Sequence, residues 1–323
     1  MDYINLGDSG LKVSRAAIGS WLTFGASVDS DGTAACVRAA LDEGVNFIDT
    51  ADIYNYGEAE RVLGGALDGV PRHSYVLATK AFFPMSDDPN DQGLSRKHLF
   101  ASIDASLARL RTDHVDLYQC HRYDANTPLD ETGRAMGDLI RRGKVLYWGV
   151  SCWRPAQIKE ACFLADELGA PPPISNQPPY SLLRRDIEQE VIPVCEEEGL
   201  SQVVFSPLAQ GILCGKYSGG SIPEGSRGAD PNSNHFMLDR LAEREMLDRV
   251  DQMVELAGDL GTTPARLALA WCLRDEPVAS VIFGARTIAQ VQDNVAAVAL
   301  ELDDETLDQL DELFPGPPEL EDI

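Results

Sequence analysis

The feature that most constrains the fold is a regular alternation of short apolar runs with amphipathic segments along almost the whole chain. Eight runs have the length and composition of buried strands: residues 16–18, 45–48, 75–79, 115–119, 145–150, 174–176, 203–205 and 279–282. The segments between them have the period of a helix: near residues 32–43, 57–68, 95–109, 128–142, 154–168, 186–198, 240–260 and 287–298. Eight strand–helix units of this kind predict an α/β fold, a closed parallel (β/α)8 TIM barrel.

Residues at the ends of the predicted helices agree with this pattern. Ser95 and Thr287 stand where N-caps are expected. Glycines stand where four of the helices should stop: Gly44, Gly143, Gly169 and Gly199. Three segments fall outside the repeat: an N-terminal β-hairpin over residues 6–15, a long connection over residues 211–239 and an extra C-terminal helix over residues 304–314. Since a barrel with insertions accommodates this length, we expect residues 1–323 to form one barrel domain.

The runner-up architecture is a doubly wound sheet, which requires a glycine-rich G-x-G-x-x-G turn after its first strand. The chain has AIGSWLTFG at that point, which does not fit. The nearest approach to a P-loop, GILCGKY, is one residue short and has Tyr217 in place of the Ser or Thr that binds magnesium. We therefore keep the barrel.

Polar residues follow six successive predicted strands, at the end of the barrel where TIM-barrel enzymes carry their chemistry. In chain order they are Asp49, Lys80, His121, Ser151, Asn176 with Gln177, and Ser206. A lone lysine or histidine after a strand is usually solvated, and a lone Asp49 would be read as a turn or N-cap acid. Their joint occurrence predicts a ring of functional groups around one mouth of the barrel.

Four side chains, Asp49, Tyr54, Lys80 and His121, together suit acid catalysis. A free tyrosine has a pKa of about 10, and a nearby ammonium lowers it by stabilising the phenolate. We expect Asp49 to hold Lys80 by an ion pair beside Tyr54, and His121 to position a carbonyl oxygen. Such a group donates a proton to a carbonyl that receives a hydride. Tyr56 is interpreted as a neighbour that lines the pocket or packs.

Composition narrows the partners and the location. The net charge of −25 argues against a nucleic-acid ligand. No apolar run is long enough for a membrane span, and the polar N-terminus does not resemble a signal peptide. Seven dispersed cysteines without a CxxC pair indicate reduced thiols and no metal site, so we expect a cytoplasmic protein. Only six of the 27 basic residues are lysine, which favours a halophilic protein over a merely acidic mesophilic one.

The residues around these positions resemble the aldo-keto reductase superfamily. GVNFIDTADIYNYGEAERVLGGAL is similar to its first signature, VLATK to the strand that carries the lysine, and HVDLYQCHRYD to the strand that carries the histidine. The likeness continues in family order through GKVLYWGVSCW, SNQPPYSLL, FSPLAQGILCGKY, LALAWCLR and VIFGARTIAQVQDN. Within the superfamily, the chain most resembles the potassium-channel β-subunit-like branch, which includes bacterial reductases of L-glyceraldehyde 3-phosphate.

The resemblance implies an oxidoreductase that reduces a small-molecule aldehyde or ketone with NADPH, bound in extended form without a Rossmann motif. It makes Tyr54 the proton donor, with Asp49 and Lys80 tuning it and His121 orienting the substrate. It implies cofactor contacts from Ser20, Trp21, Ser151, Asn176, Gln177, Phe205, Ser206, Pro207, Leu208, Ala209, Gly211, Lys216, Arg227, Gly284, Arg286, Gln290, Asp293 and Asn294. It implies a substrate pocket of Trp21, Tyr54, Phe83, His121 and Arg122.

Several details stay open at this point. Core packing is an alternative role for Trp21 and Phe83, and a structural salt bridge is one for Arg122. Arg286 stands where the family commonly has a small hydroxyl residue; an arginine suits a 2′-phosphate and favours NADP+/NADPH, with NADH use still open. Asp293 is expected to face the adenine amine.

The resemblance also carries a second function hypothesis, an NADP(H)-binding redox-sensing regulatory subunit with slow turnover. Channel β-subunits typically have asparagine where this chain has His121, which favours a working reductase. The related branch often assembles into tetramers or larger rings, so the resemblance allows a homo-oligomer.

Overall fold

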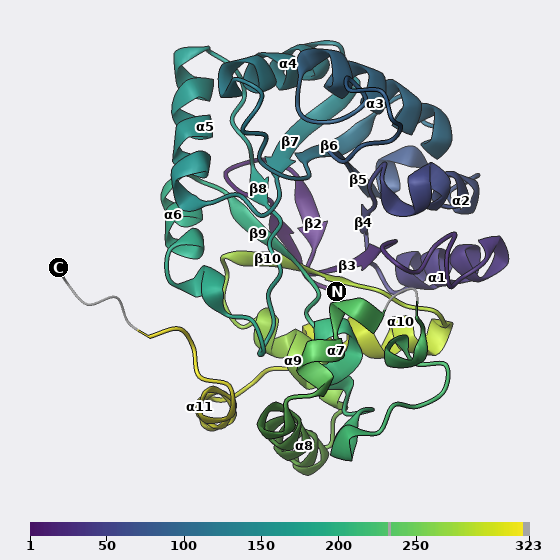
Figure 1. Ribbon diagram of the computed structural model, residues 1–323, viewed down its shortest axis with the longest axis vertical. Helices are drawn as coiled ribbons and strands as arrows, with labels where there is room; N and C mark the ends of the chain where they lie inside the picture. Colours follow the sequence, from purple (N-terminus) through teal and green to yellow (C-terminus); the bar gives the residue numbers. More distant parts are fainter. Residues whose placement is uncertain (232–233, 319–323) are drawn as a thin grey trace.

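A closed parallel barrel forms the centre of the molecule in the computed structural model, which describes residues 1–231 and 234–318. Its strands are β3 (Ala16–Gly19), β4 (Phe47–Asp49), β5 (Val76–Ala81), β6 (Val115–Cys120), β7 (Val145–Val150), β8 (Ser175–Asn176), β9 (Ser201–Phe205) and β10 (Val278–Phe283). They follow one another around the ring, and β10 pairs with β3 to close it (Figure 1). The predicted TIM barrel is confirmed, with strand bounds shifted by a few residues.

Helices surround this barrel (Figure 1). They are α1 (Ser30–Asp42), α2 (Glu58–Ala66), α3 (Arg96–Leu110), α4 (Leu129–Arg141), α5 (Pro155–Glu167), α6 (Val191–Glu197), α7 (Leu238–Leu241), α8 (Arg244–Asp259), α9 (Pro264–Cys272), α10 (Ile288–Val295) and α11 (Asp304–Leu313). The hydroxyls of Ser95 and Thr287 accept hydrogen bonds from backbone N–H groups three residues on, as predicted for N-caps. The four predicted stop glycines all have positive φ.

Two boundaries differ from the sequence prediction. The hairpin consists of β1 (Tyr3–Asn5) and β2 (Lys12–Ser14), paired antiparallel, so it starts before residue 6. Its first strand is mostly exposed and therefore has no apolar run to mark it. The predicted helix over 186–198 is a short 3-10 turn (Asp186–Glu188) followed by α6, in which Pro193 lies in the first turn, the only helical turn that tolerates proline.

Helix α9 was not among the predicted helices, although it directly precedes β10. All but two of its residues are buried, so the segment lacks the polar face on which a helical period is recognised. The predicted long connection contains short 3-10 turns at Ala209–Cys214, Ser218–Gly220, Arg227–Ala229 and Asn234–Phe236. Residues 232–233 of that prediction lie outside the described residues. The predicted C-terminal helix is present as α11.

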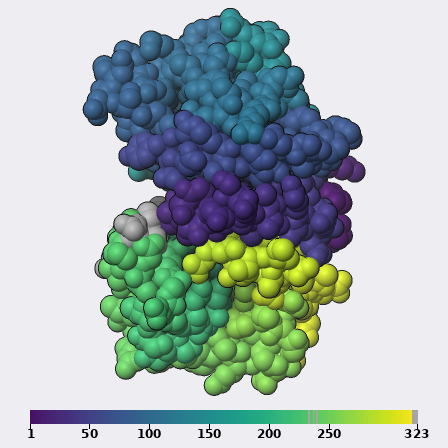
Figure 2. Space-filling model, turned by 90° about the vertical axis from the view of Figure 1, so that its right-hand side faces the viewer, coloured from purple at the N-terminus to yellow at the C-terminus, as the bar shows by residue number. Residues whose placement is uncertain are grey.

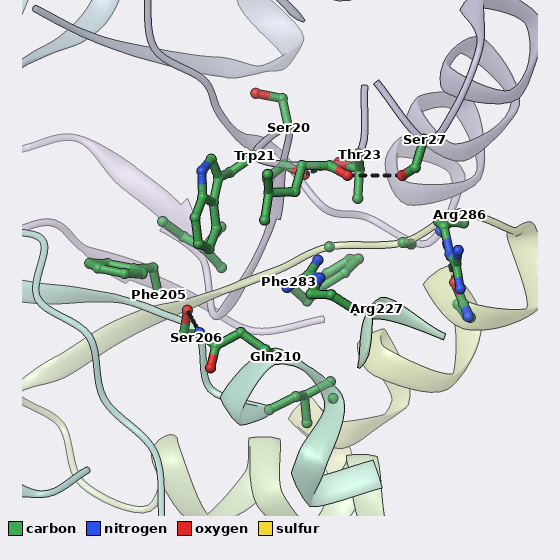
Figure 3. A pocket seen from close by; sticks show the side chains of 18 of the residues that line it. Ser20, Trp21, Thr23, Ser27, Phe205, Ser206, Gln210, Arg227, Phe283 and Arg286 are labelled. Carbon is green, nitrogen blue, oxygen red and sulfur yellow. Dashed lines mark hydrogen bonds between the residues drawn. The ribbon is translucent and has the colours of Figure 1, made fainter. Parts of the chain in front are cut away.

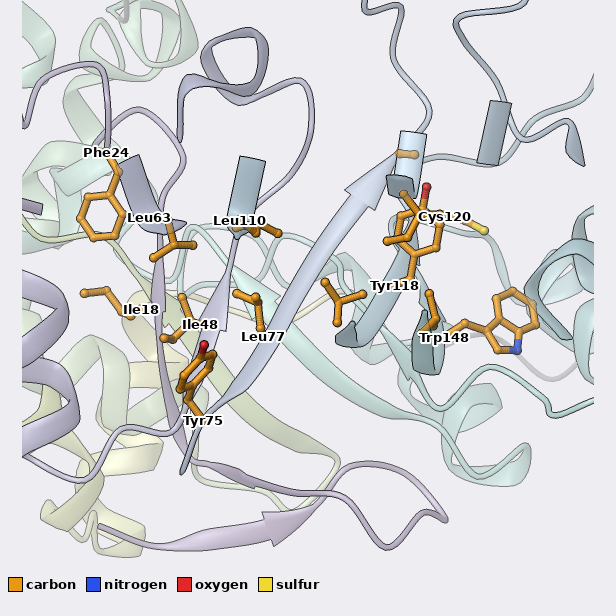
Figure 4. Packing of buried hydrophobic residues seen from close by; sticks show 14 of the residues in the cluster. Ile18, Phe24, Ile48, Leu63, Tyr75, Leu77, Leu110, Tyr118, Cys120 and Trp148 are labelled. Carbon is orange, nitrogen blue, oxygen red and sulfur yellow. The ribbon is translucent and has the colours of Figure 1, made fainter. Parts of the chain in front are cut away.

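Side-chain alternation along the strands divides the core into two parts. Small and aliphatic residues such as Ala17, Ala78 and Leu117 fill the inside of the barrel. Residues on the opposite strand faces pack beneath the helices, and Figure 4 shows part of this layer, including Ile18, Ile48, Leu77, Tyr118 and Trp148. Because successive residues point to opposite faces, the register of each strand decides which polar residues enter the mouth.

The ring of helices closes where an N-terminal helix and a C-terminal helix lie side by side. Helices α1 and α10 pack against each other, and Figure 2 shows them in contact on one face of the molecule. Within the described residues, no helix combines the length and the apolar character needed to cross a membrane.

Candidate active site

A buried ion pair lies at the mouth of the barrel. Asp49 ends β4 and Lys80 is the next-to-last residue of β5, so neighbouring parallel strands bring them together. The Lys80 ammonium lies 2.6 Å from Asp49 Oδ2 and donates a second hydrogen bond to the backbone carbonyl of Thr50 at 2.8 Å. Both side chains are almost completely buried. This pair is the predicted one.

Two glutamines hold the other oxygen of Asp49. Gln177, directly after β8, donates to Oδ1 at 2.9 Å, and Gln119 of β6 donates to the same oxygen at 3.3 Å. Gln119 was missed by the sequence argument, which took only residues at strand ends. Its spacing of two from His121 and from the interior Leu117 would have identified it.

Tyr54 reaches this pair from the turn after β4, in a 3-10 segment (Tyr54–Gly57). Its hydroxyl lies 3.3 Å from Lys80 Nζ, and the ammonium is 4.9 Å from the centre of the phenol ring. Tyr56, two residues on, is 70% exposed. Of the two tyrosines in this motif, Tyr54 is the one that meets the ion pair.

The electrostatics of the phenol differ in one respect from the sequence argument. Burial raises the pKa of Tyr54, and although Lys80 acts in the opposite direction, the net shift is upward. Burial lowers the pKa of Lys80, but the attraction of Asp49 and Tyr54 outweighs it and the net pKa is raised. The phenol of Tyr54 is therefore protonated at neutral pH and Lys80 is charged. A phenolate formed at Tyr54 would be stabilised by the charge of Lys80.

His121 directly follows β6 and completes the group. Burial lowers its pKa well below the usual value, and the charges of Lys80 and Arg122 lower it further. Its ring meets the Tyr54 ring edge-on at 5.7 Å and the Phe83 ring edge-on at 5.0 Å between centres. The imidazole of His121 is therefore neutral at neutral pH and can offer a hydrogen bond but no positive charge.

A cavity of about 1390 Å³ opens from this group. Figure 3 shows Trp21 and Phe205 on one side of the cavity and Arg286 on the other, with Arg227 and Phe283 between them. All five predicted substrate-pocket residues line it, as do all the predicted cofactor residues except Asn176 and Ala209. The lining also includes Gln210 and Phe283, which the sequence argument did not name.

The two exceptions correct the sequence prediction. Asn176 pairs in register with Val150 and Gln202, and its amide donates to Gln202 Oε1 at 3.2 Å. It therefore points to the helix side of the sheet, because Gln177, the next residue, takes the side that faces Asp49. Ala209 is buried in the cluster beneath α8 and α9.

Besides Arg122 beside His121, the cavity lining includes three cations: Lys216, Arg227 and Arg286. Arg286 directs both terminal nitrogens to the carbonyl of Gly225 at 3.2 Å. Burial lowers the pKa of Arg227, and the nearby Arg286 lowers it further. Cations gathered in one cavity of a strongly acidic chain fit an anionic ligand.

Two further predicted residues have definite surroundings. Asp293 lines the cavity and also accepts hydrogen bonds from Arg266 Nε at 2.8 Å and Thr263 Oγ1 at 3.1 Å, so α9 orients it. Arg122 donates to the carbonyl of His121 at 2.5 Å and lies over the Phe83 ring at 5.6 Å. None of the described carboxylates forms an ion pair with Arg122. The structural salt bridge that the sequence left open is therefore not seen within the described residues.

Comparison with known proteins agrees with this geometry. The profile of the aldo/keto reductase family matches residues 16–314. The chain belongs to this family. As an aldo/keto reductase it falls among oxidoreductases, and the resemblance predicted from the motifs is confirmed.

Curated relatives of this aldo/keto reductase extend over nearly its whole length. It is 41% identical to a probable voltage-gated potassium channel subunit beta of Arabidopsis thaliana, with 98% of each chain covered. It is also 41% identical to a protein of the same description from Oryza sativa subsp. japonica, again over 98% of each chain. A putative voltage-gated potassium channel subunit beta of Schizosaccharomyces pombe is 40% identical, covering 97% of this chain and 93% of that one.

Proposed function

We propose that this protein reduces aldehydes or ketones to alcohols with NADPH, and that Tyr54 is the general acid. The observation that carries the proposal is the contact of the Tyr54 hydroxyl with Lys80 Nζ at 3.3 Å, at one end of a cavity large enough for a dinucleotide and a small substrate. Family membership supports the oxidoreductase class. The roles of the individual residues are our assignment.

In this proposal the cofactor would be held by Ser151 and Gln177 at its nicotinamide end, by Phe205 against the ring, and by Lys216, Arg227 and Arg286 at its phosphates. When bound, it supplies the hydride. The chain itself supplies the proton: a neutral His121 positions the carbonyl oxygen near the Tyr54 hydroxyl, which donates as negative charge develops there. Lys80, fixed by Asp49, then stabilises the phenolate.

The test is Tyr54→Phe, measured by NADPH oxidation over a panel of phosphorylated and unphosphorylated aldehydes. We expect kcat to fall by roughly 10²- to 10⁴-fold, because the general acid is lost, while the Kd for NADPH stays within about twofold. Tyr56→Phe is the matched control, since that phenol is 70% exposed and does not line the cavity. Near-wild-type turnover of Tyr54→Phe would disprove the assignment.

A second candidate function is a regulatory subunit that binds NADP(H) tightly and turns over slowly. The observation that favours it is the description of the relatives as potassium channel β subunits. The rate of cofactor release separates the two candidates. Cofactor that co-purifies, dissociates over hours and supports no turnover with any carbonyl in the panel would favour the regulatory subunit.

A further inference from the structure

The turn that presents Tyr54 is held in an unfavourable backbone conformation. Asn55 and Tyr56 both have φ of 49°, and Gly57 has φ of 83°. Two of these three residues carry a Cβ, and a left-handed conformation persists at such residues only when the surroundings enforce it. The position of the phenol therefore depends on the contacts that hold this turn, among them a hydrogen bond from the Asn55 amide to the carbonyl of Gly25 and the contacts at its start and end.

The start of the turn is fixed by Asp52, whose side chain is completely buried. Its Oδ1 accepts a hydrogen bond from the backbone N–H of Ile53 at 2.6 Å, immediately before Tyr54. Its Oδ2 accepts one from the hydroxyl of Ser102, on α3, at 2.9 Å. The backbone N–H of Asp52 donates to the carbonyl of Lys80 at 3.2 Å. One residue thus joins the turn, α3 and the strand that carries the lysine.

The end of the turn rests on a second buried group. Arg109 of α3 pairs with the fully buried Glu60 of α2 at 2.6 Å. A Cβ on Gly57 would lie 2.7 Å from Arg109 Cδ, so the turn passes directly over this arginine. Glu60 also accepts from the hydroxyl of Thr79 at 2.6 Å. The turn therefore lies on a polar cluster that contains two carboxyl groups and one guanidinium.

The charge balance of this cluster leaves Asp52 without a cation of its own. Burial and the charge of Glu60 raise its pKa to about 7, while the bonds from Ser102 and Ile53 and the charge of Arg109 act in the opposite direction. A further titratable neighbour among the described residues is the buried Tyr118 of β6, whose pKa is raised by burial and by the charge of Asp52. Because both hydrogen bonds favour the ionised carboxylate, Asp52 holds the turn most firmly when deprotonated.

Neither Asp52 nor Ser102 lines the cavity, so any effect of theirs on the reaction is indirect, through the residues of the turn or through Lys80. We propose that Asp52 is a positioning residue, which together with Ser102 fixes the strained turn so that the Tyr54 hydroxyl stays beside Lys80. This inference rests on the proposed role of Tyr54 as the acid.

The first test is hydrogen exchange of the cofactor-free protein, followed by mass spectrometry of peptides that span residues 51–57. Asp52→Ala should accelerate exchange in this segment by roughly tenfold or more, since the tie that opposes local opening is gone. Asp52→Asn, which keeps an acceptor for Ile53, should recover most of the protection. Asp116→Asn is the matched control: Asp116 is also buried and bound to a backbone N–H, but it lies at the opposite end of the barrel.

The second test is steady-state kinetics with the best carbonyl compound from the Tyr54 panel. A displaced acid lowers kcat, so we expect a loss of about 10- to 100-fold in Asp52→Ala and a few-fold loss in Asp52→Asn and Ser102→Ala, with KM and the Kd for NADPH unchanged. The wild-type kcat should rise with pH through about 7, and Asp52→Asn should lack this limb.

Each outcome decides the inference. If Asp52→Ala matches Asp116→Asn in both exchange and kcat, Asp52 is not a positioning residue. If Asp52→Ala does not fold, Ser102→Ala, which removes a single hydrogen bond, takes its place by the same two criteria. If Tyr54→Phe keeps full turnover, the proposed function and this inference both fail; if only the Asp52 and Ser102 variants behave like the control, this inference alone fails.

Discussion

The cationic side chains at the two ends of the cavity differ in burial and in their partners. At the tyrosine end, Lys80 is fully buried and satisfied by Asp49, Thr50 and Tyr54. At the far end, the guanidinium of the exposed Arg286 hydrogen-bonds to the carbonyl of Gly225 and forms no ion pair with the described residues, while Lys216 and Arg227 also line the open cavity.

This difference indicates what each end is for. A buried charge whose partner comes from the protein belongs to the folded core, and removing it leaves the other charge unpaired. Charges that form no ion pair with the described residues are available to an anion from outside. Substitutions at the tyrosine end should therefore reduce stability and kcat, whereas substitutions at the far end should reduce affinity and leave the fold intact.

The largest effect is expected for Lys80→Met. It leaves Asp49 buried and unpaired, so the free energy of unfolding should fall by about 3–5 kcal/mol, as for other broken buried ion pairs. Loss of the charge beside the phenol should lower kcat by at least about a hundredfold. Urea denaturation and NADPH oxidation measure the two effects. Lys144→Met is the control, because Lys144 forms its ion pair with Asp104 at the surface; an equal loss of stability in both variants would contradict the comparison.

An intermediate effect is expected for Arg286→Ser. If the guanidinium binds a 2′-phosphate, the Kd for NADPH should rise by roughly 10- to 100-fold, the value of a hydrogen bond to a charged group, with the Kd for NADH unchanged. Titration of nicotinamide fluorescence measures both constants. Arg244→Ser is a matched control, since Arg244 also bonds to a loop carbonyl, that of Gly219, but lies outside the cavity lining. Equal weakening of both cofactors would show that Arg286 does not read the 2′-phosphate.

A smaller and more selective effect is expected for Arg122→Gln. This guanidinium faces the substrate pocket without a carboxylate partner among the described residues, so it should attract carbonyl compounds that carry a carboxylate or phosphate. Their KM should rise by about tenfold, while neutral aldehydes keep theirs. Arg38→Gln, an exposed substitution on α1, is the control. A uniform change in KM across charged and neutral aldehydes would remove Arg122 from substrate selection.

The barrel was predictable because strand and helix periods alternate so regularly. The elements that the sequence prediction missed have one cause in common. The first strand of the hairpin is exposed and α9 is buried on nearly all sides, so neither shows a contrast between two faces. A pattern method needs such a contrast. Helix ends were found where a single residue decides them, as at Ser95 and Thr287.

The predicted site residues also separate into those that a local pattern marks and those that it does not. Nearly all of the residues predicted from strand ends and family motifs line one cavity, and their roles stay predictions. Asn176 was assigned wrongly because its register places it on the helix side of the sheet, which its neighbours in sequence do not reveal. Asp52 was passed over because its partner, Ser102, lies fifty positions away on α3. The halophilic character, the cytoplasmic location and the oligomeric state stay predictions.

Closure of the barrel by β10 against β3 also bears on how the chain folds. The pairs Val281 with Ala16 and Phe283 with Ile18 join residues more than 250 positions apart, and Arg15 binds the carbonyls of Leu273 and Val278 across the same seam. Contacts this distant form slowly, and a nascent chain can make them only after β10 has been synthesised. Ser20 and Arg286 lie on either side of that seam and line the same cavity. A cofactor that contacts both residues would bind only the closed barrel. Its binding would therefore stabilise the last part of the barrel to form during folding.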